Sequence, residues 1–168
     1  MMAYRRLLIW LGRFRWFSWL TYTFIVPLDR FLYSRSGGRV SVAHIGLERP
    51  AALPTLLLTT TGRKSRQPRT TPVVYVEDGD RLVVMASNFG REHHPAWSGN
   101  LMANPNAKVR IRARERSVVA THASEEEKRA LWPRLLEVYP AWEAYTHRTD
   151  RSFRAFFLEP AELVRPPT

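Results

Sequence analysis

The residues best suited to chemistry lie in one short segment, Leu56–Tyr75. Two apolar runs flank four cationic side chains, and Gly62, Ser65 and Gln67 lie among these: Arg63, Lys64, Arg66 and Arg69. Arginine offers planar, bidentate donors to phosphate and carboxylate, and lysine offers a point charge. The pattern predicts a strand, a basic turn and a second strand, with the turn as an anion site. A solvated turn is the alternative, but it leaves the interleaved glycine, serine and glutamine unexplained.

Other candidate groups are sparse. His93 and His94 are adjacent, but the sequence supplies no clear third ligand, so hydrogen bonding at a helix entry is favoured over a metal site. The chain contains no G-x-S-x-G, Walker A or G-x-G-x-x-G motif. If the protein is an enzyme, we expect a cofactor to carry the chemistry and the protein to bind and orient it.

An aromatic group follows near the C-terminal end of the chain. Tyr139, Trp142 and Tyr145 are spaced by three residues, which places them near one face of a helix. Core packing is one interpretation. The other is a wall over a flat ring system, with the tyrosine hydroxyls as donors. The polar residues that follow, Thr146–Arg148, place the helix near the surface and favour the second interpretation.

Composition limits the class of partner. The 168 residues carry a net charge of +11, with 26 Lys and Arg against 15 Asp and Glu. This excess suggests a nucleic acid, an anionic membrane surface or a multiply charged small molecule. The basic stretch Lys108–Arg116, which alternates as one strand would, lacks the aromatic residues that stack on bases, and this argues against nucleic acid. The absence of cysteine excludes disulfides and thiol chemistry and fits a cytoplasmic protein.

Residues 1–36 differ from the rest of the chain. Residues 1–33 are dense in aromatic side chains, interrupted by Arg5, Arg6, Arg13 and Arg15, and the uninterrupted apolar run, Trp16–Leu28, is too short for a spanning helix of about 20 residues. We expect an amphipathic helix. Either it lies in an anionic membrane interface, which would make the protein peripheral on the inner face of the cell membrane, or it packs on the domain or on a second subunit of a homodimer.

The remaining segments predict hairpin-linked strands and a few helices. Val40–Ile45 suggests a short strand, Asp78-Gly79 a hairpin and Arg81–Ala86 an apolar strand. The further expected elements are a turn at 87–90, a helix from Pro95 to Asn104, a strand at 117–122, a helix opened by a Ser124/Glu127 capping box, a short helix through 142–145 and a last strand at 153–158. This order predicts a mainly β fold with flanking helices, an antiparallel sheet or small barrel, over residues 37–165.

Four of these segments, in this order and spacing, resemble the deazaflavin-dependent nitroreductase family. They are LLLTTTGRKSRQPRTTPVVYV, DGDRLVVMASNFG, HHPAWSGNL with a following ANP, and LWPRLLEVYPAWEAYTHRTDR, together covering about residues 53 to 160. The resemblance implies a split β-barrel related to FMN-binding flavin reductases, with coenzyme F420 as cofactor and no metal.

The resemblance also implies roles for individual residues. The basic turn would hold the phosphate and oligoglutamate tail of the cofactor through Arg63, Lys64, Ser65, Gln67 and Arg69. Thr71, Pro72 and Val73 would border the deazaflavin, and its ring and ribityl chain would contact Met85, Ala86, Ser87, Asn88 and Gly90. The segment that leads into the following helix would add the cofactor-binding residues His94, Pro95, Trp97 and Asn100. Tyr139, Trp142 and Tyr145 would line the substrate pocket, and Ser87, Tyr139 and Tyr145 would serve catalysis by binding the acceptor oxygen.

The function that follows is hydride transfer from reduced F420 to an electron-poor acceptor such as a quinone or a nitro compound. The sequence has Asn88-Phe89-Gly90 where many members have a glycine pair, and Trp142 where the nitro-reducing type has tyrosine. These differences bear on nitro reduction more than on cofactor binding. An FMN-dependent reductase of the same fold and a non-catalytic F420-binding or membrane-surface protein are the alternatives.

Overall fold

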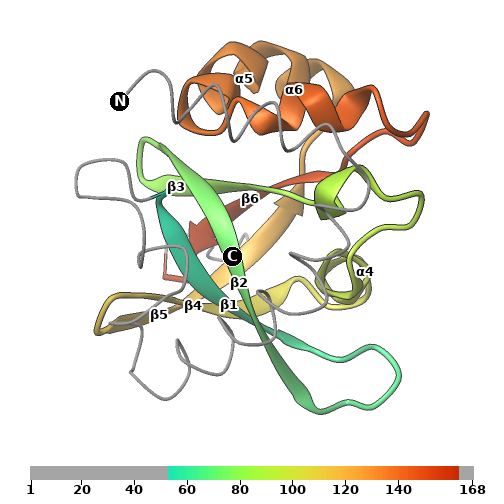
Figure 1. Cartoon of the computed structure of the whole chain (residues 1–168). Helices are drawn as coiled ribbons and strands as arrows, with labels where there is room; N and C mark the ends of the chain where they lie inside the picture. The colour runs from blue at the N-terminus through green and yellow to red at the C-terminus, as the bar shows by residue number, and fades with distance from the viewer. Residues whose placement is uncertain (1–52, 163–168) are drawn as a thin grey trace.

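Six antiparallel strands form a closed barrel in the computed structural model, which describes residues 53–162 (Figure 1). Around the barrel the strands follow the order β1-β2-β3-β6-β5-β4. Their bounds are β1 Thr55–Thr61, β2 Pro68–Asp78, β3 Arg81–Met85, β4 Asn106–Ile111, β5 Arg114–His122 and β6 Ala155–Pro160. The predicted small antiparallel barrel of a mainly β protein is thus confirmed.

The longest strand, β2, changes partners along its length. Its first part pairs with β1, from Pro68 opposite Thr61 to Val74 opposite Thr55. Its last four residues pair with β3, and the hairpin closes at Gly79, whose φ of 62° is left-handed and therefore suits glycine. The end of β3 then pairs with β6, where Met85 lies opposite Ala155. Pairing of β1 with β4 closes the barrel.

Alternation along the strands sorts the apolar side chains into two cores. One fills the barrel and includes Leu56, Leu58, Val84, Phe156 and Leu158. The intervening residues of β3 and β6 belong to a second core with residues of the helices: Val83, Met85, Ala155 and Phe157. Because successive side chains on a strand point to opposite faces, β3 and β6 supply both cores at once.

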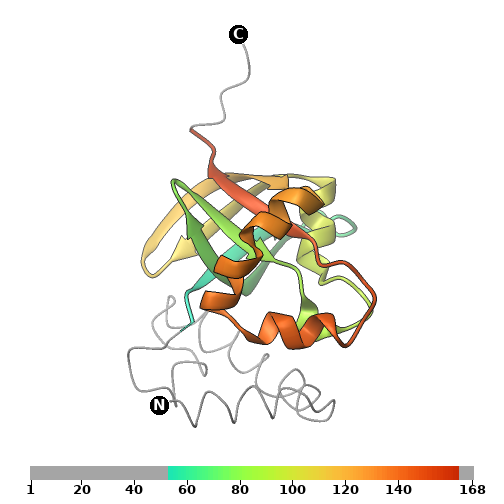
Figure 2. The same ribbon diagram turned by 90° about the horizontal axis from the view of Figure 1, so that it is seen from above.

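Within residues 53–162, three α-helices accompany the barrel: α4 Ala96–Ala103, α5 Glu125–Val138 and α6 Ala141–Thr146. In Figures 1 and 2, α5 and α6 lie together over the side formed by β3 and β6, whereas α4 lies near the end of the barrel that carries the β1–β2 turn. The predicted capping box is confirmed, since the Ser124 hydroxyl accepts from the Glu127 amide and the Glu127 carboxylate accepts from the Ser124 amide.

Two expectations about elements were wrong. Lys108–Arg116 is not one strand: β4 ends at Ile111, a two-residue turn follows, and β5 starts at Arg114. Arg112 has a φ of 55°, and no glycine, asparagine or proline marks this turn, so the alternating charges concealed it. The last strand begins at Ala155 rather than at Phe153.

Several expectations fall outside the described residues, namely the helix at 1–36, the strand at 40–45 and the ends of the predicted domain at 37 and 165. Over residues 53–162, no helix combines the length and the apolar character that crossing a membrane requires.

The capping box allows a first test. Ser124→Ala removes the hydroxyl that accepts from the Glu127 amide at the start of α5, and we expect a loss of about 1 kcal/mol in the free energy of unfolding. Urea unfolding followed by circular dichroism measures this. Glu126→Ala in the same exposed turn is the matched control, and equal losses in the two variants would contradict the assigned role of Ser124.

Candidate functional site

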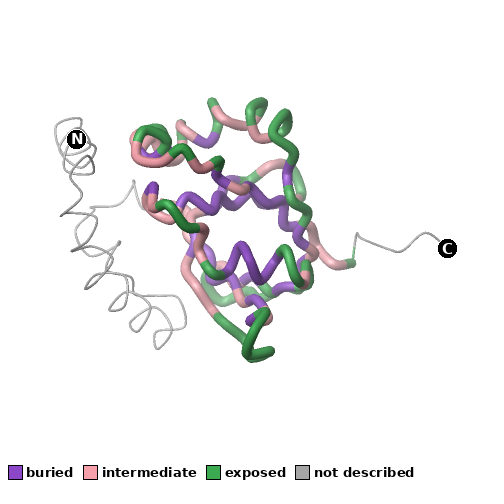
Figure 3. Tube along the Cα trace, turned by 90° about the vertical axis from the view of Figure 1, so that its right-hand side faces the viewer, coloured by how far each residue is buried: buried purple, intermediate pink, exposed green. Residues whose placement is uncertain are grey.

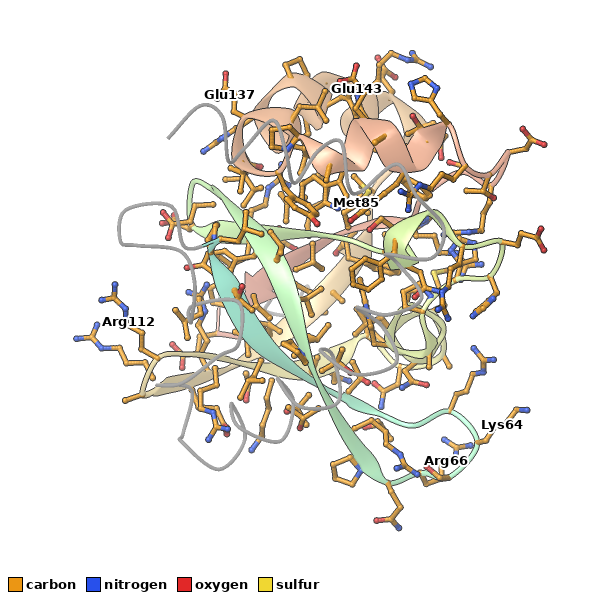
Figure 4. The ribbon with its side chains drawn as sticks, in the orientation of Figure 1. Lys64, Arg66, Met85, Arg112, Glu137 and Glu143 are labelled. Atoms are coloured by element: carbon orange, nitrogen blue, oxygen red, sulfur yellow. The ribbon has the colours of Figure 1, made fainter. Side chains whose placement is uncertain are left out.

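The β1–β2 turn exposes its cationic side chains. Arg63, Lys64, Arg66 and Arg69 are all exposed, and Figure 4 shows Lys64 and Arg66 extending away from the barrel. The exposed turn projects at the bottom of Figure 3. Within residues 53–162, none of these four side chains is in an ion pair with a carboxylate. The turn therefore presents uncompensated positive charge to solvent.

The turn itself is closely folded. The Gly62 amide donates to the Gln67 carbonyl at 2.8 Å, and the Arg66 amide donates to the Gly62 carbonyl at 2.7 Å. A Cβ at position 62 would lie 2.6 Å from the Ser65 hydroxyl oxygen and 3.1 Å from the Gln67 carbonyl oxygen, so the turn folds closely over this glycine. Ser65 in turn accepts weak hydrogen bonds from the Gln67 amide and the Arg69 guanidinium. Ser65 and Gln67 thus shape the turn.

A buried asparagine fixes the turn to helix α4. The side-chain oxygen of Asn100 accepts from the Arg63 amide at 3.1 Å, and its nitrogen donates to the Thr60 hydroxyl at 3.0 Å. Asn100 is 6% exposed and Thr60 is 1% exposed. Both ends of the Asn100 amide are therefore engaged within the protein, which makes this residue a support for the basic turn rather than a free ligand.

The neighbouring residue, Gly99, leaves space for the side chain of Arg63. A Cβ on Gly99 would lie 1.8 Å from a terminal nitrogen of the Arg63 guanidinium. The guanidinium consequently lies directly against the backbone of α4, where any side chain at position 99 would displace it. The Arg63 main chain is thus held by Asn100, while its guanidinium lies against Gly99.

The end of β3 leads into a left-handed turn. Asn88, Phe89 and Gly90, the short 3-10 segment η3, all have positive φ, at 50°, 57° and 72°. Asparagine tolerates this conformation, but for phenylalanine it is strained. A Cβ on Gly90 would lie 2.9 Å from the Tyr145 carbonyl oxygen, so the turn fits closely against the end of α6. The Phe89 ring meets the Tyr145 ring edge-on, with centroids 6.0 Å apart.

Arg151 holds the same turn from the segment between α6 and β6. Its guanidinium donates to the Ala86, Ser87 and Arg91 carbonyls at distances from 2.9 to 3.3 Å. It also lies 2.8 Å from Nδ1 of His94. Arg148, from the same segment, donates to the Phe89 carbonyl at 3.3 Å.

The contact with Arg151 fixes the state of His94. A guanidinium can only donate, so Nδ1 of His94 accepts and the ring proton resides on Nε2. Burial, together with the positive charges of Arg151 and Arg154 and the nearby His122, lowers the pKa of His94 to about 4. His94 is therefore neutral at physiological pH, with one defined tautomer.

The aromatic residues form one cluster, but they are not spread along one helix. Tyr139 caps the end of α5, and the other two members, Trp142 and Tyr145, lie on α6. The Tyr139 and Tyr145 hydroxyls are 2.9 Å apart and hydrogen-bonded. Burial raises the pKa of both tyrosines, so both phenols stay protonated near neutral pH. Since one hydroxyl donates to the other, the second retains a proton for a further acceptor.

Some predicted site residues belong to the cores. Trp142 is 2% exposed and lies in the core beneath α5 and α6, as does Met85; Figure 4 shows Met85 between β3 and these helices. Ala86 and Trp97 lie in the barrel core. For Trp142 the structure thus favours the core-packing interpretation, because its ring fills space between α6 and the sheet instead of facing an open wall.

The predicted residues fall into two groups. The first comprises the basic turn with α4, and the second comprises the Ser87–Gly90 turn with His94 and the tyrosine pair. Thr71, Pro72 and Val73 lie on β2 between its two ends, Val73 buried and the other two half-buried. His94 and Pro95 lead into α4 and are also half-buried.

Sequence reasoning missed three residues that position these groups: Thr60, Arg148 and Arg151. Their contacts link distant segments, and nothing in the local pattern distinguished two arginines among so many. No group of three or more potential metal ligands occurs among the residues that the structure describes.

Comparison with known proteins identifies the family to which this sequence belongs. The model of the F420H(2)-dependent quinone reductase family matches residues 32–160. The chain belongs to this family. The Mycobacterium tuberculosis protein Rv3178 is 34% identical over 115 residues, which are 68% of this chain and 95% of that protein. The F420H(2)-dependent quinone reductase Rv1261c of the same organism is 38% identical over 96 residues, 57% of this chain and 61% of that protein.

Solved structures agree with this assignment. A structure described as an F420-H2 dependent reductase (FDR-A) is 34% identical, with a TM-score of 0.58, and the match covers 63% of this chain and 94% of that one. A chain described as a domain-swapped dimer is 30% identical, with a TM-score of 0.60, over 79% of this chain and 94% of that one. The predicted family and the oxidoreductase class are thereby confirmed, and the family name implies reduced F420 as the reductant.

The Asn100 network gives a second test. Asn100→Ala leaves the buried Thr60 hydroxyl without its donor and the Arg63 amide without its acceptor, and we expect a loss of about 1–3 kcal/mol in the free energy of unfolding. Urea unfolding measures it. Met102→Ala on the same helix, where the side chain is 52% exposed, is the control and should change little. If Asn100→Ala lowered the free energy of unfolding as little as Met102→Ala, the hydrogen bonds of Asn100 would contribute little to stability.

The low pKa of His94 gives a third test. Because the folded pKa of about 4 lies below the ordinary 6.5, the unfolded chain binds a proton between these values that the folded protein does not. The stabilisation is complete above pH 6.5 and is lost as the pH falls toward 4. We expect His94→Gln to flatten the fall in denaturation midpoint over this window. His93→Gln, at an exposed neighbouring position, should retain the wild-type slope; two equal slopes would contradict the assignment.

Proposed function

We propose that this protein binds reduced F420 through its basic turn and transfers a hydride to a quinone-like acceptor. The observation that carries the proposal is the set of exposed cations on the β1–β2 turn, which have no ion-pair partner within the described part of the chain and are tied to α4 by the Arg63 amide. The phosphate and glutamate carboxylates of the cofactor tail match the donors of such a turn. A neutral acceptor alone would have no use for this charge.

The residues present fit the cofactor at both ends. The turn from Arg63 to Arg69 would hold the tail, and the segment from Ser87 to Gly90 would border the ring. When bound, reduced F420 would supply the hydride. The protein's own part is to orient the ring and the acceptor and to provide a proton where negative charge develops on the acceptor oxygen.

The tyrosine pair suits that last task. Its two hydroxyls are hydrogen-bonded to each other and stay protonated near neutral pH, so the pair has one proton to donate outward. Tyr145 also contacts Phe89 of the turn that follows Ser87. We therefore keep Ser87, Tyr139 and Tyr145 as the proposed acceptor-binding residues and assign Trp142 to the support of α6.

Other expectations remain proposals. FMN carries one phosphate and no glutamate tail, so four cations on one turn favour F420 over FMN. A homodimer finds support in the domain-swapped dimer among the structural relatives. A cytoplasmic location, contact with an anionic membrane surface through residues 1–33, kinship with FMN-binding flavin reductases, reduction of nitro compounds and a purely F420-binding role each stay predictions.

Purified protein should oxidise reduced F420 in the presence of menadione, with the return of the oxidised deazaflavin absorbance as the readout. Lys64→Ala and Arg69→Ala should each weaken F420 binding by roughly tenfold, and more for longer glutamate tails, because each removes one charge-assisted contact.

Arg112→Ala is the matched control for charge. It removes a cation from the β4–β5 turn, which lies across the barrel from Lys64 and Arg66 in Figure 4. It should leave F420 affinity unchanged. Equal losses in all three variants would mean that net charge, not the turn, attracts the cofactor. Binding of F420 without turnover on any quinone would support the non-catalytic alternative.

A further inference from the structure

Arg151 is engaged in a way that salt bridges or solubility do not explain. Its guanidinium has no carboxylate partner among residues 53–162; its hydrogen-bond partners are main-chain carbonyls and one imidazole nitrogen. The main-chain groups belong to the segment that joins β3 to α4, and Arg151 itself precedes β6. The contacts therefore fix the path of one loop from a different part of the chain.

The direction of the held carbonyls determines where the adjoining amides point. In a trans peptide the carbonyl of one residue and the amide of the next point in opposite directions. The Ala86 and Ser87 carbonyls both accept from Arg151. The Ser87 and Asn88 amides therefore both point away from the guanidinium. No hydrogen bond joins either amide to another of the residues between 53 and 162.

The backbone angles bring these two amides toward a common point. Ser87 is in the right-handed region, at φ −72° and ψ −32°, and Asn88 has a φ of 50°. A right-handed residue followed by a left-handed one turns successive amides toward the same side, an arrangement that accepts an electron-rich oxygen. The Ser87 side chain, 8% exposed, lies at the same point of the chain.

We infer that Arg151 is a positioning residue: by holding the Ala86 and Ser87 carbonyls, it directs the Ser87 and Asn88 amides to the opposite side, where they donate to an electron-rich oxygen of the bound cofactor ring. This inference rests on the proposed function for the identity of the ring. The same guanidinium sets the tautomer of His94, so one side chain orients two main-chain amides and determines which ring nitrogen of His94 donates.

Arg148 supports the same turn at a carbonyl that Arg151 does not contact. Its guanidinium donates to the Phe89 carbonyl and lies over the Tyr145 ring, 5.2 Å from the centroid. Two arginines from one short segment thus hold the strained left-handed turn and its flanks, at the Ala86, Ser87, Phe89 and Arg91 carbonyls. Strain of this kind persists only where the surroundings over-determine the conformation, and these two side chains supply that determination.

Arg151→Met tests the inference on the full-length protein, because methionine keeps a long apolar chain beside Phe153 and loses all the donors. In nitrogen-15 spectra of the free protein, we expect His94 to change from one ring tautomer to a mixture, and the Ser87 and Asn88 amide signals to move. On titration with F420, those two amides should respond in the wild-type protein, and the dissociation constant of the variant should rise roughly tenfold or more.

Two further variants complete the design. Arg129→Met, at an exposed position of α5, should leave the His94 tautomer, the two amide signals and the F420 affinity unchanged. Arg151→Lys keeps the charge but loses the planar fork, so it should show the same spectral changes in milder form. It also serves as the test if the methionine variant fails to fold.

The outcomes separate the inference from the proposed function. If wild-type protein does not bind F420, the proposed function fails, while the His94 and amide signals of the free variants still decide whether Arg151 positions the segment. If Arg151→Met keeps the wild-type His94 tautomer and the wild-type amide signals, the inference is overturned. It is overturned equally if F420 binds without moving the Ser87 and Asn88 amide signals.

Discussion

The change of partner along β2 is the constraint on which the rest of this structure depends. The strand pairs with β1 over Pro68–Val74 and with β3 over its last four residues, while the end of β3 pairs with β6. As a result, the basic turn at the start of β2 and the Ser87 turn at the end of β3 belong to different strand pairs. The paired strands β2 and β3 connect these two turns, which are the two places assigned to the charged tail and the flat ring in the proposed function.

Charged and neutral groups are also divided between the basic turn and the Ser87 turn. The exposed turn concentrates cations that have no carboxylate partner among residues 53–162, whereas the groups around the Ser87 turn are neutral or hydrogen-bonded within the protein. His94 is held uncharged, and the tyrosine pair is held protonated. Binding strength can then come from the tail, while the ring meets fixed donors that need little rearrangement. The chain belongs to a family of F420H(2)-dependent oxidoreductases, and the proposed function assigns its side chains to orienting the cofactor and donating a proton.

Local sequence signals made much of the fold predictable. The Asp78-Gly79 hairpin, the Ser124 capping box and the helix after Pro95 each depend on neighbouring residues, and each is confirmed. The misses have a common cause. The turn at Arg112 lacks turn-forming residues, and the roles of Asn100 and Arg151 exist only through contacts with segments distant in sequence. Trp142 could not be assigned from its spacing, since a buried helix face and a pocket wall use the same periodicity.

The absence of a side chain at Gly99 has a consequence for how this turn can be varied. Because the Arg63 guanidinium occupies the space where a Cβ would be, positions 63 and 99 are sterically linked although they lie on different elements. A graft of the basic turn onto a related barrel with a larger residue at the helix position would carry the arginine but not its orientation. A graft that preserves the orientation of this arginine therefore needs glycine at the helix position.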